Sequence, residues 1–359
     1  MIPLNSIGRS YCNKKERVSN MKVYNVVLIG CGHIGKAHIS DIYYRENIHM
    51  TAVVDSNLSR AKEFQRMYGA EFADVDYMPY LQMEDVDIVI IATPVSSHLK
   101  ILRDALCYQK HVLCEKPLAL NYEDGKAFFD LCKAAKTKVS VGYILRFNDT
   151  FRKVKDLIAE GAIGNLKLAR MTQNHHIMNV DRYHALLREC TPQVDCGVHY
   201  YDLLQWISGG TITAVSGMGT RIATEFTDIQ SDYGISNLFL DNGVVGYYEA
   251  GWSRSISSSN VKEFVGDAGS ISVTLRQFRS EHTEEGDLIE VFHNATGTYE
   301  IINVPADYKP MYRQICALID QIEGRPSEAP SMEEAFQTFC VGLAVDTAIK
   351  TGQKTPVKL

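Results

Sequence analysis

The sequence lacks the long apolar runs that a membrane-spanning chain needs. Its longest apolar run, near residues 86–92, has the length of a strand and falls short of the ~18 residues that cross a bilayer as a helix. A basic block is also missing, because 37 Lys and Arg residues are outnumbered by 43 Asp and Glu residues, which gives a formal net charge of −6. A mildly acidic chain of this kind is a poor candidate for binding nucleic acid or an anionic membrane surface.

The nine cysteines are scattered along the chain and include no Cys-x-x-Cys pair. Their odd number and spacing argue against a disulfide framework or a zinc site and favour reduced thiols in the cytoplasm. No metal site is predicted at the adjacent His175 and His176, which have no carboxylate or cysteine at ligand spacing. Residues 1–20 lack the apolar stretch of a secretory signal, and regular patterning begins only at Met21. We predict that residues 1–20 are a disordered or loosely packed extension.

The composition is that of an ordinary globular chain, with 359 residues of which 45% are apolar and 22% charged. At ~150 residues per domain, this length indicates about two domains. Residues 21–143 alternate short apolar runs with amphipathic stretches, which predicts an α/β fold with a doubly wound parallel sheet. From residue 144 to 359 strand follows strand, and Asn242-Gly243 is typical of a type I′ hairpin turn. This second part predicts an α+β domain with a large open, mainly antiparallel sheet.

A glycine-rich motif follows the first predicted strand. Gly30-Cys31-Gly32-His33-Ile34-Gly35 has the spacing G-x-G-x-x-G and opens a predicted helix, and Asp55 ends the next strand 20 residues after Gly35. This context is typical of a Rossmann dinucleotide-binding domain, in which the helix N-terminus binds the pyrophosphate and the carboxylate binds the ribose hydroxyls. We expect Gly30 to allow the tight turn, Gly32 to let the backbone approach the pyrophosphate, and Gly35 to let the helix pack on the strand.

The residues after Asp55 predict NAD rather than NADP as the cofactor. Ser56 and Asn57 follow it, so no arginine stands directly beyond the strand to pair with a 2′-phosphate, which the carboxylate would repel. Arg60, one helical turn further on, is the residue that could reverse this preference.

Two more motifs lie at the carboxyl ends of predicted parallel strands, where open α/β sheets bind their ligands. Thr93-Pro94 follows the fourth strand and Glu115-Lys116-Pro117 follows the fifth. By position alone Lys116 would be a solvated residue, but it adjoins the predicted nicotinamide site. Asp195 and His199 are spaced i, i+4 in a helix predicted over residues 195–207, so the carboxylate can set the basicity of the imidazole.

Together these motifs resemble the Gfo/Idh/MocA oxidoreductases, which include glucose–fructose oxidoreductase and inositol dehydrogenase. The resemblance extends from Met21 to the C-terminus and is carried by the glycine motif with His38, by Thr93-Pro94 with His98, by Glu115-Lys116-Pro117, by Tyr143 with Arg146-Phe147, and by Asp195-Cys196-Gly197-Val198-His199. It implies that Lys116, Asp195 and His199 act on the substrate and that the Lys116–Pro117 bond is cis. We expect the following cofactor contacts: Gly30, Gly32, His33, Ile34, Gly35, Asp55, Thr93, Pro94, His98, Glu115 and Lys116. We expect the following substrate contacts: Lys116, Tyr143, Arg146, His176, Asp195 and His199.

One departure from the family pattern limits what can be transferred. Family members often carry a Gly pair shortly before the catalytic Asp, whereas residues 191–194 read Thr-Pro-Gln-Val, so subfamily substrates do not carry over. Residues 174–184 are rich in polar and aromatic groups and are interpreted as a substrate-facing loop.

The expected function is an NAD-dependent dehydrogenase for a secondary hydroxyl of a sugar, sugar derivative or cyclic polyol. His199, polarised by Asp195, would take the hydroxyl proton while Lys116 stabilises charge on the oxygen. Two alternatives stay open: an NAD-dependent glycosidase that oxidises its substrate transiently, and a non-catalytic regulator that senses cofactor or sugar.

An assembly is also expected. An open sheet face over residues 212–304, with Phe239, Tyr247, Tyr248 and Trp252 in reach, together with the family resemblance, predicts a homodimer or homotetramer.

Overall fold

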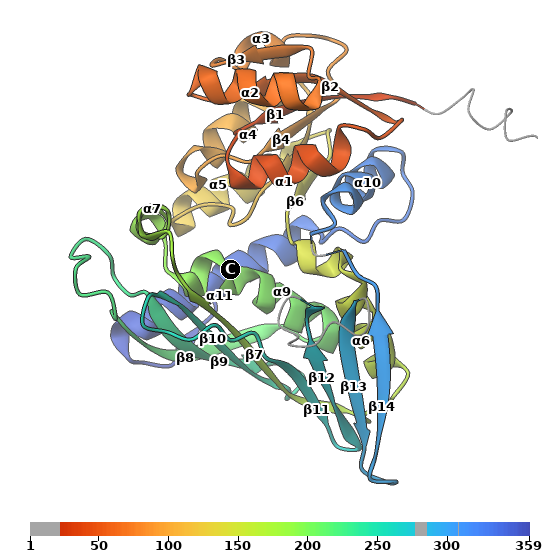
Figure 1. Cartoon of the computed structure of the whole chain (residues 1–359), viewed down its shortest axis with the longest axis vertical. Coiled ribbons are helices and arrows are strands. Elements are labelled where there is room, and N and C mark those ends of the chain that lie inside the picture. Colours follow the sequence, from red (N-terminus) through yellow and green to blue (C-terminus); the bar gives the residue numbers. More distant parts are fainter. Residues whose placement is uncertain (1–21, 277–285, 308) are drawn as a thin grey trace, which may run out of the picture.

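The computed structural model describes residues 22–276, 286–307 and 309–359. The extension predicted over residues 1–20 lies outside these residues. Two sheets organise the described chain, with the six-stranded sheet above the nine-stranded sheet and several helices between them (Figure 1). Among the described residues, no helix is both long enough and apolar enough to span a bilayer.

The first sheet is the predicted doubly wound parallel sheet. All of its strand pairs are parallel, and the central strands are almost fully buried because helices cover both faces. In spatial order its strands are β3 (Phe72–Asp74), β2 (Ile48–Val54), β1 (Tyr24–Ile29), β4 (Ile88–Ile91), β5 (His111–Cys114) and β6 (Val139–Val141).

Three helices cover each face of this sheet. One face packs against α1 (His33–Ile42), α2 (Leu58–Tyr68) and α10 (Met311–Ile322), and the other against α3 (Met78–Leu81), α4 (His98–Cys107) and α5 (Tyr122–Ala134). Local signals fix several helix ends, as in α2, where the Asn57 side chain caps the first turn and Gly69 ends the helix at φ +71°. β3 and α3 were not predicted from the sequence, because elements of three and four residues show no periodicity.

The second sheet is mixed and mostly antiparallel, as predicted. Among the described strands of this sheet, only β7 and β10 pair in parallel. In spatial order its strands are β14 (Thr298–Val304), β13 (Asp287–His293), β12 (Gly269–Thr274), β11 (Lys262–Gly266), β7 (Leu166–His176), β10 (Val245–Ser253), β9 (Tyr233–Leu240), β8 (Ile212–Thr220) and β15 (Thr355–Pro356).

The hairpin between β9 and β10 forms where it was expected, but its turn type differs. Gly243 has φ +82°, whereas Asn242 is not among the described residues with positive φ. A type I′ turn needs positive φ at both central positions, so that prediction is wrong. The backbone N–H of Gly243 donates to the carbonyl of Leu240, which closes a tight turn ahead of the left-handed glycine.

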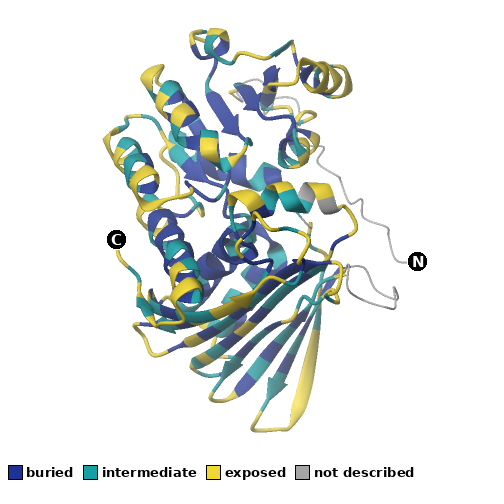
Figure 2. Ribbon diagram, turned by 90° about the vertical axis from the view of Figure 1, so that its left-hand side faces the viewer, coloured by how far each residue is buried: buried dark blue, intermediate teal, exposed yellow. Residues whose placement is uncertain are grey.

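One face of the nine-stranded sheet is covered by α6 (Asp149–Ala159), α8 (Pro192–Asp195), α9 (Gly197–Ser208) and α11 (Met332–Thr351). Figure 2 shows this sheet at the base of the molecule, with those helices above it. Side chains alternate between the two faces along each strand. Tyr248 and Trp252 are therefore buried on the covered face, with 0% and 2% exposure, while Tyr247 and Phe239 stay partly exposed on the other. The expectation that all four lie on the open face is wrong for Tyr248 and Trp252.

Three further helical segments position the site. The short 3-10 helices η1 (Val95–Ser97) and η2 (Ile144–Phe147) follow β4 and β6, and α7 (Val180–Glu189) follows β7. A capping box opens α11, because Ser331 and Glu334 exchange side-chain-to-backbone hydrogen bonds.

Candidate active site

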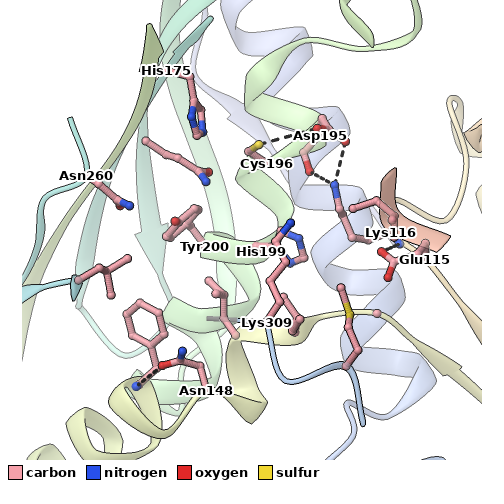
Figure 3. A pocket seen from close by; sticks show the side chains of 18 of the residues that line it. Glu115, Lys116, Asn148, His175, Asp195, Cys196, His199, Tyr200, Asn260 and Lys309 are labelled. Carbon is pink, nitrogen blue, oxygen red and sulfur yellow. Dashed lines mark hydrogen bonds and ion pairs between the residues drawn. The ribbon is translucent and has the colours of Figure 1, made fainter. Parts of the chain in front are cut away.

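A cavity of about 690 Å³ lies between the carboxyl edge of the first sheet and the covered face of the second. Both halves of the chain contribute to its wall (Figure 3). The lining includes His33, Ile34, Glu115, Lys116, Gly142, Asn148, Gln173, His175, Tyr183, Asp195, Cys196, His199, Tyr200, Trp252, Asn260, Asp287 and Lys309.

The glycine-rich loop has the geometry that a dinucleotide requires. Gly30 has φ +103°, and a Cβ there would lie 2.4 Å from the Ala92 carbonyl oxygen, so only glycine fits this turn. A Cβ on Gly35 would lie 1.9 Å from the Gly30 oxygen, which explains the close packing of α1 on β1. Gly32 differs, because a Cβ there would meet nothing within 4 Å, and no side chain caps the start of α1. The backbone beside the helix N-terminus is thus open for a pyrophosphate.

Asp55 ends β2 beside this loop and is only 8% exposed. Its two oxygens accept hydrogen bonds from the backbone N–H groups of Cys31, at 2.9 Å, and Asn57, at 2.8 Å. Arg60 lies within 3.3 Å of the same carboxylate, with its own side chain 50% exposed. The carboxylate is therefore held at the position expected for a ribose-binding group, with Arg60 directly beside it.

His98 is fully buried and supports two loops of the site. Its ring nitrogens lie 3.0 Å from the carbonyl oxygens of Thr93 and Pro117, so it ties the turn after β4 to the turn after β5. Thr93 also accepts a hydrogen bond from the Ser97 hydroxyl, at 2.7 Å. The Lys116–Pro117 bond is cis, as the family resemblance implied.

Glu115 lines the cavity and is paired with a buried histidine. His38 Nε2 lies 2.7 Å from Glu115 Oε1, and the Lys116 backbone N–H donates to Oε2 at 3.3 Å. Burial opposes ionisation of this carboxyl, but the contact with His38 and the charge of Lys116 outweigh it and lower the pKa of Glu115.

Lys116 and Asp195 meet in the centre of the site. Lys116 Nζ donates to Asp195 Oδ1 at 2.8 Å and to the Asp195 carbonyl at 3.0 Å. Burial disfavours the ammonium, yet Asp195 outweighs this effect and raises the pKa of Lys116 above its usual range. The structure thus brings a protonated lysine to the cavity, beside the predicted nicotinamide position.

His199 lies in the first turn of α9, but Asp195 does not belong to that helix. Asp195 ends the short helix α8, and the chain breaks at Cys196, so the single helix predicted over residues 195–207 is wrong. No hydrogen bond joins Asp195 to His199 in the described structure, and the carboxylate is bound to Lys116 instead. Pro192 stands at the start of α8, where its fixed φ suits the first helical position.

The imidazole of His199 is neutral in this setting. Burial, together with the positive charges of Lys116 and Lys309, lowers the pKa of His199 well below its usual range. Its Nδ1 is buried without a hydrogen-bond partner in the described structure, and the Tyr143 ring packs edge-on against the imidazole at 6.3 Å. A neutral imidazole is the form that can accept a proton.

Three predicted substrate contacts lie elsewhere. Tyr143 is fully buried behind His199 and donates to the Ala335 carbonyl at 3.2 Å. Arg146 does not line the cavity but forms a bidentate ion pair with Asp202, at 2.7 and 2.8 Å. His176 is exposed on the open face of β7, because alternation along the strand turns the neighbouring His175 toward the cavity.

Most of the cavity wall that the second half of the chain provides was not predicted from the sequence. Among the missed residues are Asn148, Gln173, Tyr200, Asn260 and Lys309. Residues 174–184 were interpreted as a loop, whereas they end β7 and continue into α7, whose Tyr183 and Leu186 line the cavity. Within the described residues no group of three or more His, Cys, Asp or Glu side chains is arranged to hold a metal ion.

A parallel sheet with a glycine turn open to a pyrophosphate, and with an ammonium and a neutral imidazole beyond it, is typical of the class of dinucleotide-binding Rossmann proteins. The chain belongs to the Gfo/Idh/MocA family. The family model described as "Oxidoreductase family, NAD-binding Rossmann fold" matches residues 24–143, and the "GFO/IDH/MocA C-terminal domain" matches residues 151–272. Together these two matches cover more than half of the chain.

Individual relatives are more distant. An uncharacterized oxidoreductase of Bacillus subtilis (strain 168) is 26% identical over 223 residues, which are 61% of this chain and 64% of that protein, less than two thirds of its length. A scyllo-inositol 2-dehydrogenase (NAD(+)) of the same organism is 28% identical over 256 residues, 69% of this chain and 73% of that protein. A crystal structure of a putative myo-inositol dehydrogenase from Sinorhizobium meliloti 1021 has a TM-score of 0.77 at 20% identity, covering 94% of this chain and 100% of that one, which shows a shared fold.

Proposed function

We propose that this protein is an NAD-dependent dehydrogenase that oxidises a secondary hydroxyl of a cyclic polyol or sugar to a ketone. The observation that carries the proposal is the convergence of Lys116, Asp195 and His199 on one cavity that His33 and Ile34 of the glycine loop also line. Relatives named as inositol dehydrogenases support the substrate class.

In this proposal His199, Lys116 and Asp195 have separate roles in the oxidation of the alcohol. A bound nicotinamide supplies the acceptor for the hydride that leaves the carbon. His199, which is neutral, takes the hydroxyl proton as the carbon–oxygen double bond forms. Lys116 donates a hydrogen bond to the same oxygen and stabilises its developing negative charge. Asp195 keeps Lys116 protonated and in place, a role that differs from the predicted polarisation of His199.

The cofactor in this proposal is NAD rather than NADP. The Asp55 carboxylate is buried at the end of β2, where a 2′-phosphate would have to approach it. Arg60 already lies 3.3 Å from that carboxylate, so its charge is directed toward Asp55. We expect the ribose diol of NAD to bind Asp55 more favourably than a phosphate does.

A substrate panel tests the proposal. Inositols, aldoses, sugar phosphates and nucleotide sugars are offered with NAD or NADP, and the absorbance of the reduced cofactor is followed. We expect net reduction with at least one polyol or sugar, and a higher kcat/KM with NAD. Release of a glycoside's leaving group without net reduction would instead indicate the NAD-dependent glycosidase, and binding without either reaction would indicate the regulator.

Two variants examine the catalytic assignment on the substrate found in this way. Lys116→Ala and His199→Ala should each lower kcat by ~10²-fold or more, the scale of losing a positioned acid–base or oxyanion-stabilising group. Binding of NAD should change little. The matched control is Lys126→Ala, which removes a surface ion pair with Asp130 on α5. Near-normal kcat in both active-site variants would refute the mechanism.

A further inference from the structure

The side chain of Lys262 is buried beside the cavity, and the proposed mechanism gives it no role. It is 1% exposed, at the start of β11 on the covered face of the nine-stranded sheet. Its Nζ donates to the Thr172 carbonyl at 2.6 Å, to the Val261 carbonyl at 3.3 Å, and to the side-chain oxygen of Asn260. The same ammonium lies 4.5 Å from the centre of the Tyr200 ring.

Burying such a charge is costly. Desolvation lowers the pKa of Lys262 well below its usual range, and among the described residues no carboxylate contacts its Nζ. If residue 262 only filled the core, a well-packed apolar side chain would do so without this cost. The three oxygen acceptors and the aromatic ring around Lys262 instead indicate that it holds neighbouring groups in place.

Lys262 holds the side chain of Asn260, which lines the cavity. The two residues are two positions apart in an extended segment and so share one face of the sheet, whereas Val261 between them is 47% exposed on the other face. Figure 3 shows Asn260 and His175 on the sheet side of the cavity and Lys116 on the side of the first sheet.

The backbone on both sides of Asn260 is fixed as well. The N–H of Ser259 donates to the Asn174 carbonyl at 3.1 Å, and the N–H of Val261 donates to the Thr172 hydroxyl at 2.9 Å. Asn260 is thus held in the segment that leads into β11, with little freedom to adapt to a ligand.

The contact with Lys262 also decides which way the amide points. Lys262 Nζ is placed to donate to three oxygens, so the Asn260 atom that faces it is the oxygen, and the NH₂ group is left for the cavity. We propose that Asn260, oriented by Lys262, is a specificity-determining hydrogen-bond donor that binds an acceptor oxygen of the substrate away from the reacting carbon. This inference rests on the proposed dehydrogenase function and names a second recognition point within its substrate site.

The groups around Asn260 further restrict the kind of ligand that can bind there. His175 lies in the same wall, and burial together with the charges of Lys262 and Lys309 lowers its pKa, so it stays neutral. A donor NH₂ favours a hydroxyl, ring or carboxylate oxygen and disfavours a protonated amine, which has no acceptor to offer. The site is therefore suited to hydroxylated or acidic polyols and sugars rather than to amino sugars.

Steady-state kinetics of Asn260 variants with saturating NAD test this. Asn260→Ala should raise KM for the polyol or sugar by ~3- to 10-fold, the scale of one hydrogen bond, with kcat changed by less than ~3-fold. Asn260→Asp keeps the shape but replaces the donor by an acceptor, so its KM should rise at least as much. The control is Asn237→Ala, an exposed amide on the open face of the same sheet.

Substrate analogues and a double variant separate recognition from structure. One singly deoxygenated analogue should lose affinity with the wild type but show no further loss with Asn260→Ala. Lys262→Met should raise KM alone but add nothing in the Asn260→Ala background, because it acts through the amide. The matched control Lys167→Met removes an exposed surface lysine. A purely structural Lys262 predicts instead an additive loss in kcat and thermal stability.

The outcomes distinguish this inference from the proposed function. Wild-type oxidation with unchanged KM in Asn260→Ala and Asn260→Asp would overturn the inference and leave the function intact. If the wild type oxidises no panel compound, the proposed function fails, and calorimetric titration of the NADH-loaded protein with myo-inositol decides the inference. Weaker binding by Asn260→Ala would support it, and equal affinity or no binding to the wild type would overturn it.

Discussion

At the scale of single residues, the partner of Asp195 is the contact with the largest consequence for the chemistry. The carboxylate binds Lys116 Nζ at 2.8 Å rather than the imidazole of His199. Lys116 is therefore the group whose ionisation Asp195 controls, and His199 is left neutral by burial and by nearby positive charge. Proton acceptor and charge stabiliser are thus separate groups with pKa values moved in opposite directions, a pattern typical of catalytic sites.

Asp195→Asn tests this division through the pH profile. In the wild type the charge of Asp195 raises the pKa of Lys116, so the ammonium persists above the usual lysine pKa of about 10.4. Without that charge burial dominates, and the pKa of Lys116 falls. We expect the alkaline limb of kcat/KM to move to lower pH by about one unit or more, with the acid limb unmoved. A profile in which the acid limb moves instead would show that Asp195 acts on His199.

The residues of the first sheet could be predicted because local sequence determines them. Gly30 needs a positive φ, Gly35 needs close packing, and Asp55 and Lys116 each follow a strand that is visible as an apolar run. Asn260 and His175 carry no such signal. Which residue of a strand faces the cavity depends on strand register and alternation. His176 was therefore predicted as the substrate contact, whereas His175 lines the wall.

At the scale of elements, the break between α8 and α9 and the path of α7 shape the site. The helix is interrupted at Cys196, so Asp195 ends α8 and binds Lys116, while His199 lies in the first turn of α9. α7 lies over the cavity, and the backbone of Val95 hydrogen-bonds to the Glu189 side chain, which connects α7 to η1 of the first half. These features depend on contacts between distant segments. The break could not be predicted from the sequence, because residues 195–207 show the 3.6-residue periodicity of a continuous helix.

Arg146 connects three elements and gives a prediction at this scale. It pairs with Asp202 on α9 and with Glu334 at the start of α11, and the Arg146 and Asp202 side chains are 4% and 0% exposed. Arg146→Met would leave Asp202 buried and unpaired, which should cost about 3–5 kcal/mol in the free energy of unfolding. Urea unfolding followed by circular dichroism measures this.

Two further variants show whether the cost arises from the unpaired charge. Arg146→Met combined with Asp202→Leu removes both charges and should recover most of the lost stability. Arg152→Met, which breaks an exposed pair between α6 and Glu328 in the segment between α10 and α11, should change the unfolding free energy by less than about 1 kcal/mol. A double variant no more stable than Arg146→Met alone would contradict the argument.

At the scale of the whole molecule, the two halves are interleaved more than the sequence suggested. The predicted division at residues 143 and 144 leaves α10 with the second half, yet Ile315, Leu318 and Ile319 of this helix pack into the core of the first sheet. Phe339 of α11 lies so close to α5 that a Cβ on Gly125 would be 2.0 Å from its ring. The sequence does not predict that these C-terminal helices pack on the first half of the chain. An amphipathic pattern shows that a helix packs against something but not against which element.

The uncovered face of the nine-stranded sheet leads to the last prediction. It presents Ile235, Phe239 and Tyr247, all partly exposed, on central strands, while every described helix that packs on this sheet lies on the other face. We expect a second copy to cover this face and predict a homodimer or homotetramer by light scattering at micromolar concentration. Ile235→Lys would place a charge in the centre of the contact and should produce monomers, because a buried unpaired charge opposes association. Met67→Lys, at a 49% exposed position on α2, is the control and should leave the assembly unchanged. A wild type that scatters as a monomer would rule out this assembly.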